Sequence, residues 1–147
     1  MTAFADVTLP APRVTLRQLT EADAPALYGF FSNPEIMRYW SRPVMTDPAE
    51  IAPLMDRILA DYQSGASLPL GIERNADRVL LGDCTLFGFH AASRRAEIGY
   101  VLGRGFAGEL QSLPAALAAT PGLLGRFAAE LTPLGAGLAV VGAFALI

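Results

Sequence analysis

The sequence contains one cysteine, one histidine and no lysine, and each scarcity excludes a class of function. Cys84 has no second cysteine with which to form an internal disulfide. No N-terminal stretch combines a basic region, an apolar core and a cleavage site, so the sequence does not indicate secretion. We therefore expect a cytoplasmic protein. The length of 147 residues fits one domain with a substantial hydrophobic core.

Basic residues are also few: all eleven are arginine, and they occur singly except for Arg94 and Arg95. The net charge is −3 and no basic stripe is present, so nucleic acid is not expected as a direct partner. His90 and Cys84 have no nearby partners suited to a metal site or a catalytic triad. No metal site is expected; His90 is interpreted as a bystander and Cys84 as a packed thiol.

Charged side chains are absent from residues 131–147, a run of 17. That length is at the lower limit for crossing about 30 Å of hydrocarbon. Pro133, three glycines and the lack of an anchoring residue beyond Ile147 argue against a membrane span. We favour a buried strand over 138–147 that pairs beside Val101, because continuous apolar runs suit a strand covered on both faces.

The N-terminal third carries signals for one strand and two helices. Pro10 and Pro12 are expected to keep the start of the chain irregular, and alternating apolar and polar residues predict a strand over 13–19. A hydroxyl cap followed three residues later by a carboxylate predicts a helix over 20–31. A second, short helix is predicted over 34–40.

The middle of the chain adds one amphipathic helix and three strands. Their predicted ranges are 47–63 for the helix and 68–74, 78–89 and 95–102 for the strands. The second of these strands is long, and a bulge is expected at Gly82 or Gly88. This order of elements predicts an α/β (α+β) fold in which helices cover a sheet.

Residues 94–108, RRAEIGYVLGRGFAG, form a charged turn, a β-branched and aromatic run and a glycine-rich exit. In residue types and order this stretch resembles the central strand and cofactor loop of the GCN5-related N-acetyltransferases. The closest resemblance is to the branch that acetylates the N-termini of ribosomal proteins. Residues 16–40, LRQLTEADAPALYGFFSNPEIMRYW, resemble the opening strand and paired helices of the same branch. The resemblance covers about residues 13–108.

The resemblance implies a mixed, mainly antiparallel sheet flanked by helices and incomplete at its C-terminal end. It implies acetyl-coenzyme A (acetyl-CoA) as co-substrate and a primary amine as acceptor, either a protein N-terminus or a small-molecule amine. Backbone groups of Val101 and Leu102 would pair with the pantetheine arm of acetyl-CoA. Gly108 would belong to the loop that surrounds the pyrophosphate.

The attacking amine is mostly protonated near neutral pH, so some group must take its proton. Glu97 is the best-placed carboxylate by sequence, and the alternative for it is an ion pair with Arg94 or Arg95 on a solvated face. The resemblance also places Tyr39 and Trp40 in one wall of the acceptor cleft. Their alternative is packing in the core or at its rim.

Past Gly108 the sequence departs from the family pattern. Leu110 stands where the family's pyrophosphate loop needs bare backbone, and residues 109–147 read as a divergent or truncated ending. The alternative function is therefore a non-catalytic, truncated or frame-altered remnant that acts as a binding module. The identity of the acceptor amine and the oligomeric state, a homodimer included, are left open.

Overall fold

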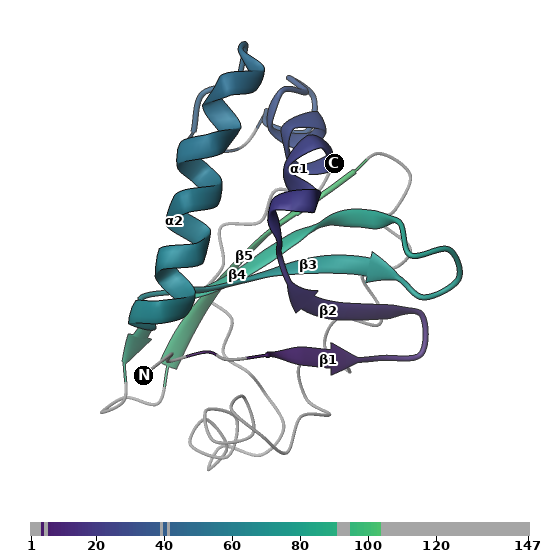
Figure 1. The fold of residues 1–147 in the computed structure, drawn as a ribbon, viewed down its shortest axis with the longest axis vertical. Helices are drawn as coiled ribbons and strands as arrows, with labels where there is room; N and C mark the ends of the chain where they lie inside the picture. Colours follow the sequence, from purple (N-terminus) through teal and green to yellow (C-terminus); the bar gives the residue numbers. More distant parts are fainter. Residues whose placement is uncertain (1–3, 5, 39, 41, 91–94, 104–147) are drawn as a thin grey trace.

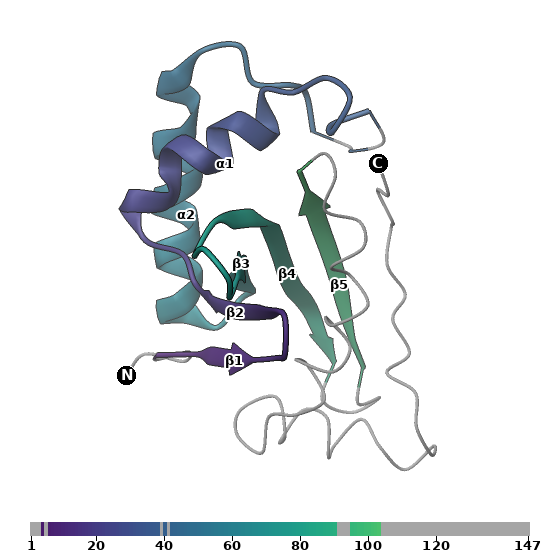
Figure 2. The same cartoon turned by 90° about the vertical axis from the view of Figure 1, so that its right-hand side faces the viewer.

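A computed structural model of the chain describes residues 4, 6–38, 40, 42–90 and 95–103. The strands are β1 (Thr8–Pro10), β2 (Val14–Gln18), β3 (Leu68–Arg74), β4 (Leu80–His90) and β5 (Arg95–Leu102), and the helices are α1 (Ala24–Phe31) and α2 (Ile51–Ser64). The strands form one antiparallel sheet in the order β1-β2-β3-β4-β5. Both helices lie on the same face of this sheet (Figures 1 and 2). The predicted fold class, an α/β (α+β) arrangement with a mainly antiparallel sheet flanked by helices, is confirmed.

Both helices begin at the capping signals that the sequence contains. Before α1, the Thr20 amide donates a hydrogen bond to the Asp23 carboxylate at 2.8 Å. Before α2, the Asp47 carboxylate accepts from the Ala49 amide and the Asp47 amide donates to the Glu50 carboxylate, both at 2.9 Å. In each case a side chain satisfies a backbone donor that the first helical turn leaves without a partner.

Strand β1 corrects the expectation that prolines keep the start of the chain irregular. Thr8–Pro10 pairs antiparallel with β2 and places Leu9 opposite Leu16. An edge strand tolerates proline because one of its two sides needs no ladder of hydrogen bonds. Leu9 is only 2% exposed, so its burial in the core favours this pairing.

The predicted short helix over 34–40 is also wrong, because residues 34–38 form turns. The Asn33 side-chain oxygen accepts the amides of Glu35 and Ile36 at 2.9 and 3.4 Å. This side chain caps a single turn, in which the Met37 amide also donates to the Asn33 carbonyl at 3.0 Å, and no helix follows among the described residues up to 38. The side chains of Ile36 and Met37 are nevertheless buried, so this segment contributes to the hydrophobic core.

Strand β4 carries a bulge near each of the two glycines named as candidates. Between Ile72 and Glu73 the partner on β4 moves by two residues, from Gly82 to Leu80, so β4 has one extra residue there. A second shift lies between Phe87 and His90, beside Gly88, whose φ is 59°. A bulge changes which side chains face a given side of the sheet. The first bulge places Leu80 and Asp83 on one face.

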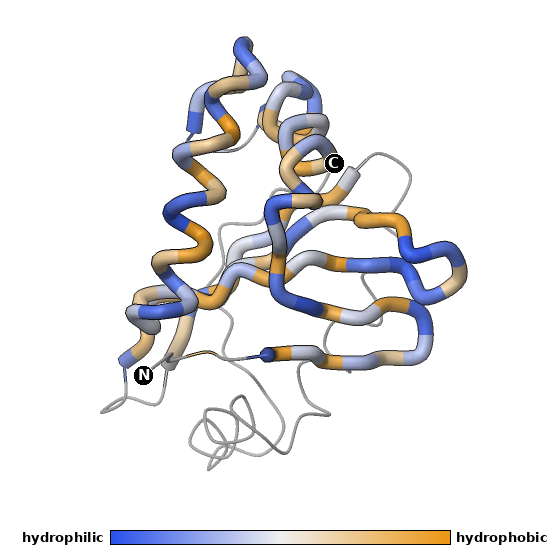
Figure 3. The backbone as a smooth tube through the Cα atoms, viewed as in Figure 1, coloured by the Kyte–Doolittle hydropathy of each residue, from blue (hydrophilic) through white to orange (hydrophobic). Residues whose placement is uncertain are grey.

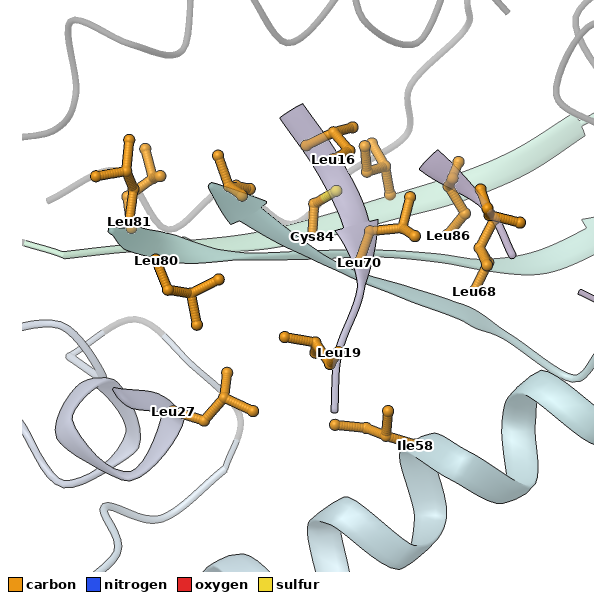
Figure 4. Packing of buried hydrophobic residues seen from close by; sticks show 14 of the residues in the cluster. Leu16, Leu19, Leu27, Ile58, Leu68, Leu70, Leu80, Leu81, Cys84 and Leu86 are labelled. Carbon is orange, nitrogen blue, oxygen red and sulfur yellow. The ribbon is translucent and has the colours of Figure 1, made fainter. Parts of the chain in front are cut away.

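Apolar side chains are buried on both faces of the sheet. Figure 4 shows Leu19, Leu27 and Ile58 on the helix side of β3 and β4, and Leu16 and Cys84 among the buried side chains. Figure 3 shows apolar and polar residues alternating along α2, as a helix with one buried face requires. Cys84 is fully buried and free, as expected for a packed thiol.

Tyr62 of α2 joins the helix to the sheet through its hydroxyl group. The hydroxyl accepts a hydrogen bond from the Leu19 amide at 2.9 Å and donates one to the Pro69 carbonyl at 2.5 Å. Burial raises the pKa of Tyr62 to about 12, so the hydroxyl keeps its proton at every physiological pH. The side chain therefore ties α2 to the end of β2 and the start of β3.

We expect Tyr62→Phe to lower the free energy of unfolding by about 1–3 kcal/mol, because the buried Leu19 amide loses its partner. Urea unfolding measures this difference. Tyr28→Phe is the matched control, since Tyr28 packs against the core and its hydroxyl has no hydrogen bond within the described residues. Equal losses in the two variants would contradict the role of the hydroxyl.

No helix within the described residues is both long and apolar enough to cross a bilayer. The apolar run over 131–147, including the strand proposed over 138–147, lies outside the described residues, as do Gly108 and Leu110.

Candidate functional site

A pocket of about 710 Å³ lies at the β4 and β5 end of the sheet, on the face that the helices cover. Asp83 and Thr85 of β4 and Gly99 of β5 line it from the sheet, and Leu27 and Phe31 line it from α1. Residues of α2 complete the wall. A concave, mostly apolar space with a few polar groups is the usual form of a ligand site.

The register of β4 and β5 explains why these residues share the pocket. Asp83 lies opposite Val101, and Thr85 lies opposite Gly99. Alternate residues of a strand point to the same face, so Asp83 and Thr85 both point toward the helices. A Cβ atom at Gly99 would lie 3.6 Å from the Phe87 ring, so the missing side chain leaves room in the pocket.

Trp40 lines this pocket and also packs against the core, whereas its place in an acceptor cleft stays a prediction. Its ring meets the Phe31 ring edge-on, with centroids 6.3 Å apart. Its indole Nε1 is buried and has no hydrogen-bond partner among the described residues. A buried donor without an acceptor is costly, and a bound molecule can supply the acceptor. Tyr39 lies outside the described residues.

Asp83 is the functional candidate that the sequence prediction missed. It is 7% exposed, and its Oδ1 atom is buried without a hydrogen-bond partner among the described residues. Burial raises the pKa of Asp83 to about 7, because the apolar surroundings disfavour the charged form. The available signal was an acidic residue inside the apolar run LLGDCTLF, where an unpaired carboxylate has no structural benefit.

The α2 side of the pocket combines apolar Leu54 and Ile58 with charged residues. Arg57 and Asp61 line it from the helix, and Arg42 lines it from the segment after α1. The Ser67 hydroxyl donates a hydrogen bond to the Asp61 carboxylate. Asp61 therefore has a partner, in contrast to Asp83.

Glu97, the carboxylate that the sequence nominated as base, lies on β5 opposite Phe87. Its Oε1 atom would be 3.3 Å from a Cβ atom built on Gly88, which places the carboxylate beside the second bulge. Glu97 is half-buried and is not among the residues that line the pocket. Of its expected ion-pair partners, Arg94 lies outside the described residues, and only the backbone of Arg95 is described. The role of Glu97 stays a prediction.

The C-terminal end of β5 holds the two predicted cofactor contacts, Val101 and Leu102. The Gly103 amide donates to the Leu81 carbonyl of β4 at 2.7 Å. Backbone groups point alternately to the two sides along a strand. The Val101 amide therefore points toward β4, and the Leu102 amide points toward the outer edge of β5. No strand of the described residues pairs with that edge.

No group of three His, Cys, Asp or Glu side chains in the described part of the chain is placed to hold a metal ion.

The described residues form a mixed α/β domain with a candidate ligand pocket, and comparison with known proteins identifies the family. Residues 13–131 match the family model of the acetyltransferase (GNAT) domain. The chain belongs to this family. The match extends to residue 131, whereas the resemblance recognisable in the sequence ends at about residue 108.

Known relatives support the same assignment. The chain is 37% identical over 112 residues to the uncharacterized N-acetyltransferase YoaA of Bacillus subtilis, covering 71% of this chain and 62% of YoaA. It superimposes on a putative ribosomal-protein-serine acetyltransferase from Vibrio cholerae with a TM-score of 0.67 and 16% identity, over 78% of this chain and 66% of that one.

A spermidine N-acetyltransferase from Vibrio cholerae, solved in complex with CoA and spermine, superimposes with a TM-score of 0.56 and 24% identity. The match covers 72% of this chain and 64% of that enzyme. At these identities the two solved structures establish the fold alone. The chain spans less than two thirds of the length of YoaA and of the spermidine acetyltransferase.

Proposed function

We propose that the chain is an N-acetyltransferase domain that transfers the acetyl group of acetyl-CoA to a primary amine. The observation that carries the proposal is the pocket of about 710 Å³, which Gly99 lines from β5 and Asp83 and Thr85 line from β4. Family membership supports acetyl transfer, and the pocket supplies space for an acceptor beside the strand that would hold the thioester. The acceptor is either a protein N-terminus or a small-molecule amine.

The co-substrate would bind along the outer edge of β5. The pantetheine arm contains two amide groups, which pair with a strand edge as another strand does. The outward amide of Leu102 fits this pairing, whereas the Val101 amide points toward β4, so the contact expected for Val101 would require β4 and β5 to separate there. Gly108 would meet the pyrophosphate as part of the following loop.

In the reaction, the amine nitrogen attacks the thioester carbon and forms a C–N bond. The carbonyl oxygen becomes an oxyanion, which a backbone N–H at the end of β5 would stabilise. The intermediate collapses, the C–S bond breaks, and the thiolate of CoA leaves and takes a proton. Because the amine enters mostly as an ammonium ion, a carboxylate must first remove one proton, and the sequence nominates Glu97 for this step.

Acetyl-CoA at 1 mM is expected to raise the thermal unfolding midpoint by about 5–10 °C when it is present at a hundred times its Kd. Differential scanning fluorimetry measures the shift. AMP at the same concentration lacks the pantetheine arm and should give a much smaller change. An unmoved midpoint at millimolar acetyl-CoA would refute the proposed function and favour the non-catalytic binding module.

A further inference from the structure

We propose that Asp83 is the group that receives the acceptor amine: its carboxylate binds the ammonium form in the pocket and takes one proton from it. This proposal rests on the proposed acetyl transfer and names a catalytic residue for it. The sequence nominated Glu97 for this step, so the two carboxylates are rivals with different positions in the fold.

The first reason is the position of Asp83 relative to the end of β5. Asp83 lies directly opposite Val101 in the β4–β5 register, and facing residues of this kind have Cβ atoms roughly 5 Å apart. Glu97 is four residues before Val101 on the same strand, which corresponds to roughly 13 Å. If the thioester lies at the end of β5, Asp83 is the nearer carboxylate.

The second reason is that the pocket holds both a buried acceptor and a buried donor without partners among the described residues, Asp83 Oδ1 and Trp40 Nε1. An ammonium group supplies the donors that a carboxylate needs. An oxygen elsewhere on the acceptor molecule would satisfy the indole N–H. Trp40 and Phe87 also line the pocket, and aromatic rings beside a site favour a cation where it can lie over a ring face.

The electrostatic surroundings leave Asp83 without a paired cation. Its titratable neighbours are Arg57, Asp61 and Tyr62 from α2, Arg42 from the segment after α1 and Cys84 beside it on β4. α1 contributes apolar side chains to the lining, and β5 contributes Gly99. No hydrogen bond within the described residues joins Arg42 or Arg57 to Asp83. Burial alone accounts for its raised pKa of about 7, a value suited to a base at neutral pH.

The proton balance of the step is simple. An N–H bond of the ammonium ion breaks and an O–H bond forms on Asp83, which leaves a neutral amine and a neutral acid. The amine lone pair then forms the C–N bond while the C–S bond of acetyl-CoA breaks. A second proton from the nitrogen neutralises the departing thiolate, and Asp83 returns its proton to solvent.

The test compares Asp83→Asn, Glu97→Gln and wild type in a thiol-release assay with acetyl-CoA. The probe amines are spermidine, a tripeptide amide that begins with serine, and n-butylamine. Asp83→Asn is expected to lower kcat/KM for the amine about 100-fold and to remove an acidic limb of the pH profile centred near pH 7. Glu97→Gln is expected to lower it less than about fivefold. Asp56→Asn, an exposed carboxylate on α2 outside the pocket, is the matched control and should match wild type.

Two further measurements separate chemistry from folding and from cofactor binding. Asp83→Asn should keep the full thermal shift with acetyl-CoA, and at pH 8 it should melt no lower than wild type. The reason is that ionised Asp83 costs stability as pH rises through its raised pKa, whereas asparagine does not ionise. A lost acetyl-CoA shift would indicate a structural role and overturn the proposal.

The remaining outcomes are also decisive. If Asp83→Asn is within threefold of wild type, or if Glu97→Gln instead removes the acidic limb, Asp83 is not the proton acceptor. Acetyl-CoA binding without thiol release from any probe amine overturns it too. If acetyl-CoA produces no thermal shift in the wild type, the proposed function itself has failed, which is a different result from the loss of Asp83 chemistry.

Discussion

Arg17→Ala is expected to lower the free energy of unfolding by about 3 kcal/mol at pH 7, because two buried carboxylates lose their shared cation. Arg17 of β2 donates to Glu73 at 2.5 Å and, through both terminal nitrogens, to Asp23 at 2.9 Å. The carboxylate side chains are 5% and 10% exposed, respectively. We place the loss at the lower end for buried pairs because the exposed Arg78 still reaches Glu73 at 2.6 Å.

The pH dependence of this loss follows from Asp23. Burial alone would raise the pKa of Asp23, but hydrogen bonds from Arg17 and the Thr20 amide lower it below the usual 3.8. A carboxyl whose pKa is lowered on folding stabilises the fold above its unfolded pKa, and that stabilisation disappears as pH falls. Without Arg17, burial dominates and the pKa of Asp23 rises. The deficit of Arg17→Ala should therefore shrink between pH 7 and pH 4.

Urea unfolding at the two pH values measures both effects. Arg74→Ala is the matched control, since Arg74 binds Asp77 with the same two-pronged geometry at 2.9 and 2.6 Å on an exposed surface. An exposed pair contributes about 0–1 kcal/mol. Equal losses for Arg17 and Arg74 would contradict the importance of burial at the Arg17 cluster.

Much of the fold was predictable because its signals are local. The caps before α1 and α2 need only residues three positions apart, and β2, β3 and β5 show clear patterns of apolar residues. The family resemblance likewise depends on contiguous stretches around β2 and β5. Such features can be recognised in the sequence without knowing what each element packs against.

The errors concern features decided by tertiary contacts. The pairing of β1 depends on Leu9 reaching the core opposite Leu16. The turn after Asn33 carries a helix-start contact and buries Ile36 and Met37, but no helix follows it within the described residues up to 38. Arg17 and Glu73 are 56 residues apart in sequence, so no local sequence pattern predicts their contact.

The candidate site was the least predictable part, because it depends on strand register. Asp83 shares the pocket face with Thr85 because the β4–β5 pairing is regular from Gly82 to Phe87, and the bulge before Gly82 brings Leu80 onto that same face. A sequence pattern detects the strand but not a shift of one residue within it. Glu97 was selected from its position along the chain, whereas the position of Asp83 opposite Val101 depends on how β4 pairs with β5.

Gly82→Ala is expected to be severely destabilising, by about 3 kcal/mol or more, because the added methyl has no space. A Cβ atom at Gly82 would lie 1.9 Å from the Val101 carbonyl oxygen and 2.9 Å from its carbon. These are backbone atoms, so β4 and β5 would have to separate at the pair that joins Gly82 to Leu102. The same movement would displace Asp83 and Val101, so acetyl-CoA should give a smaller thermal shift in any Gly82→Ala protein that folds.

Gly29→Ala provides the matched control for this substitution. Gly29 lies in α1, and a Cβ atom built there meets nothing within 4 Å. Alanine in a helix interior is favoured over glycine by about 0.5–1 kcal/mol, so Gly29→Ala should unfold at higher urea than wild type. The same added methyl group is thus expected to lower the free energy of unfolding at position 82 and to raise it at position 29. A Gly82→Ala protein as stable as wild type would show that β4 and β5 do not approach this closely beside the pocket.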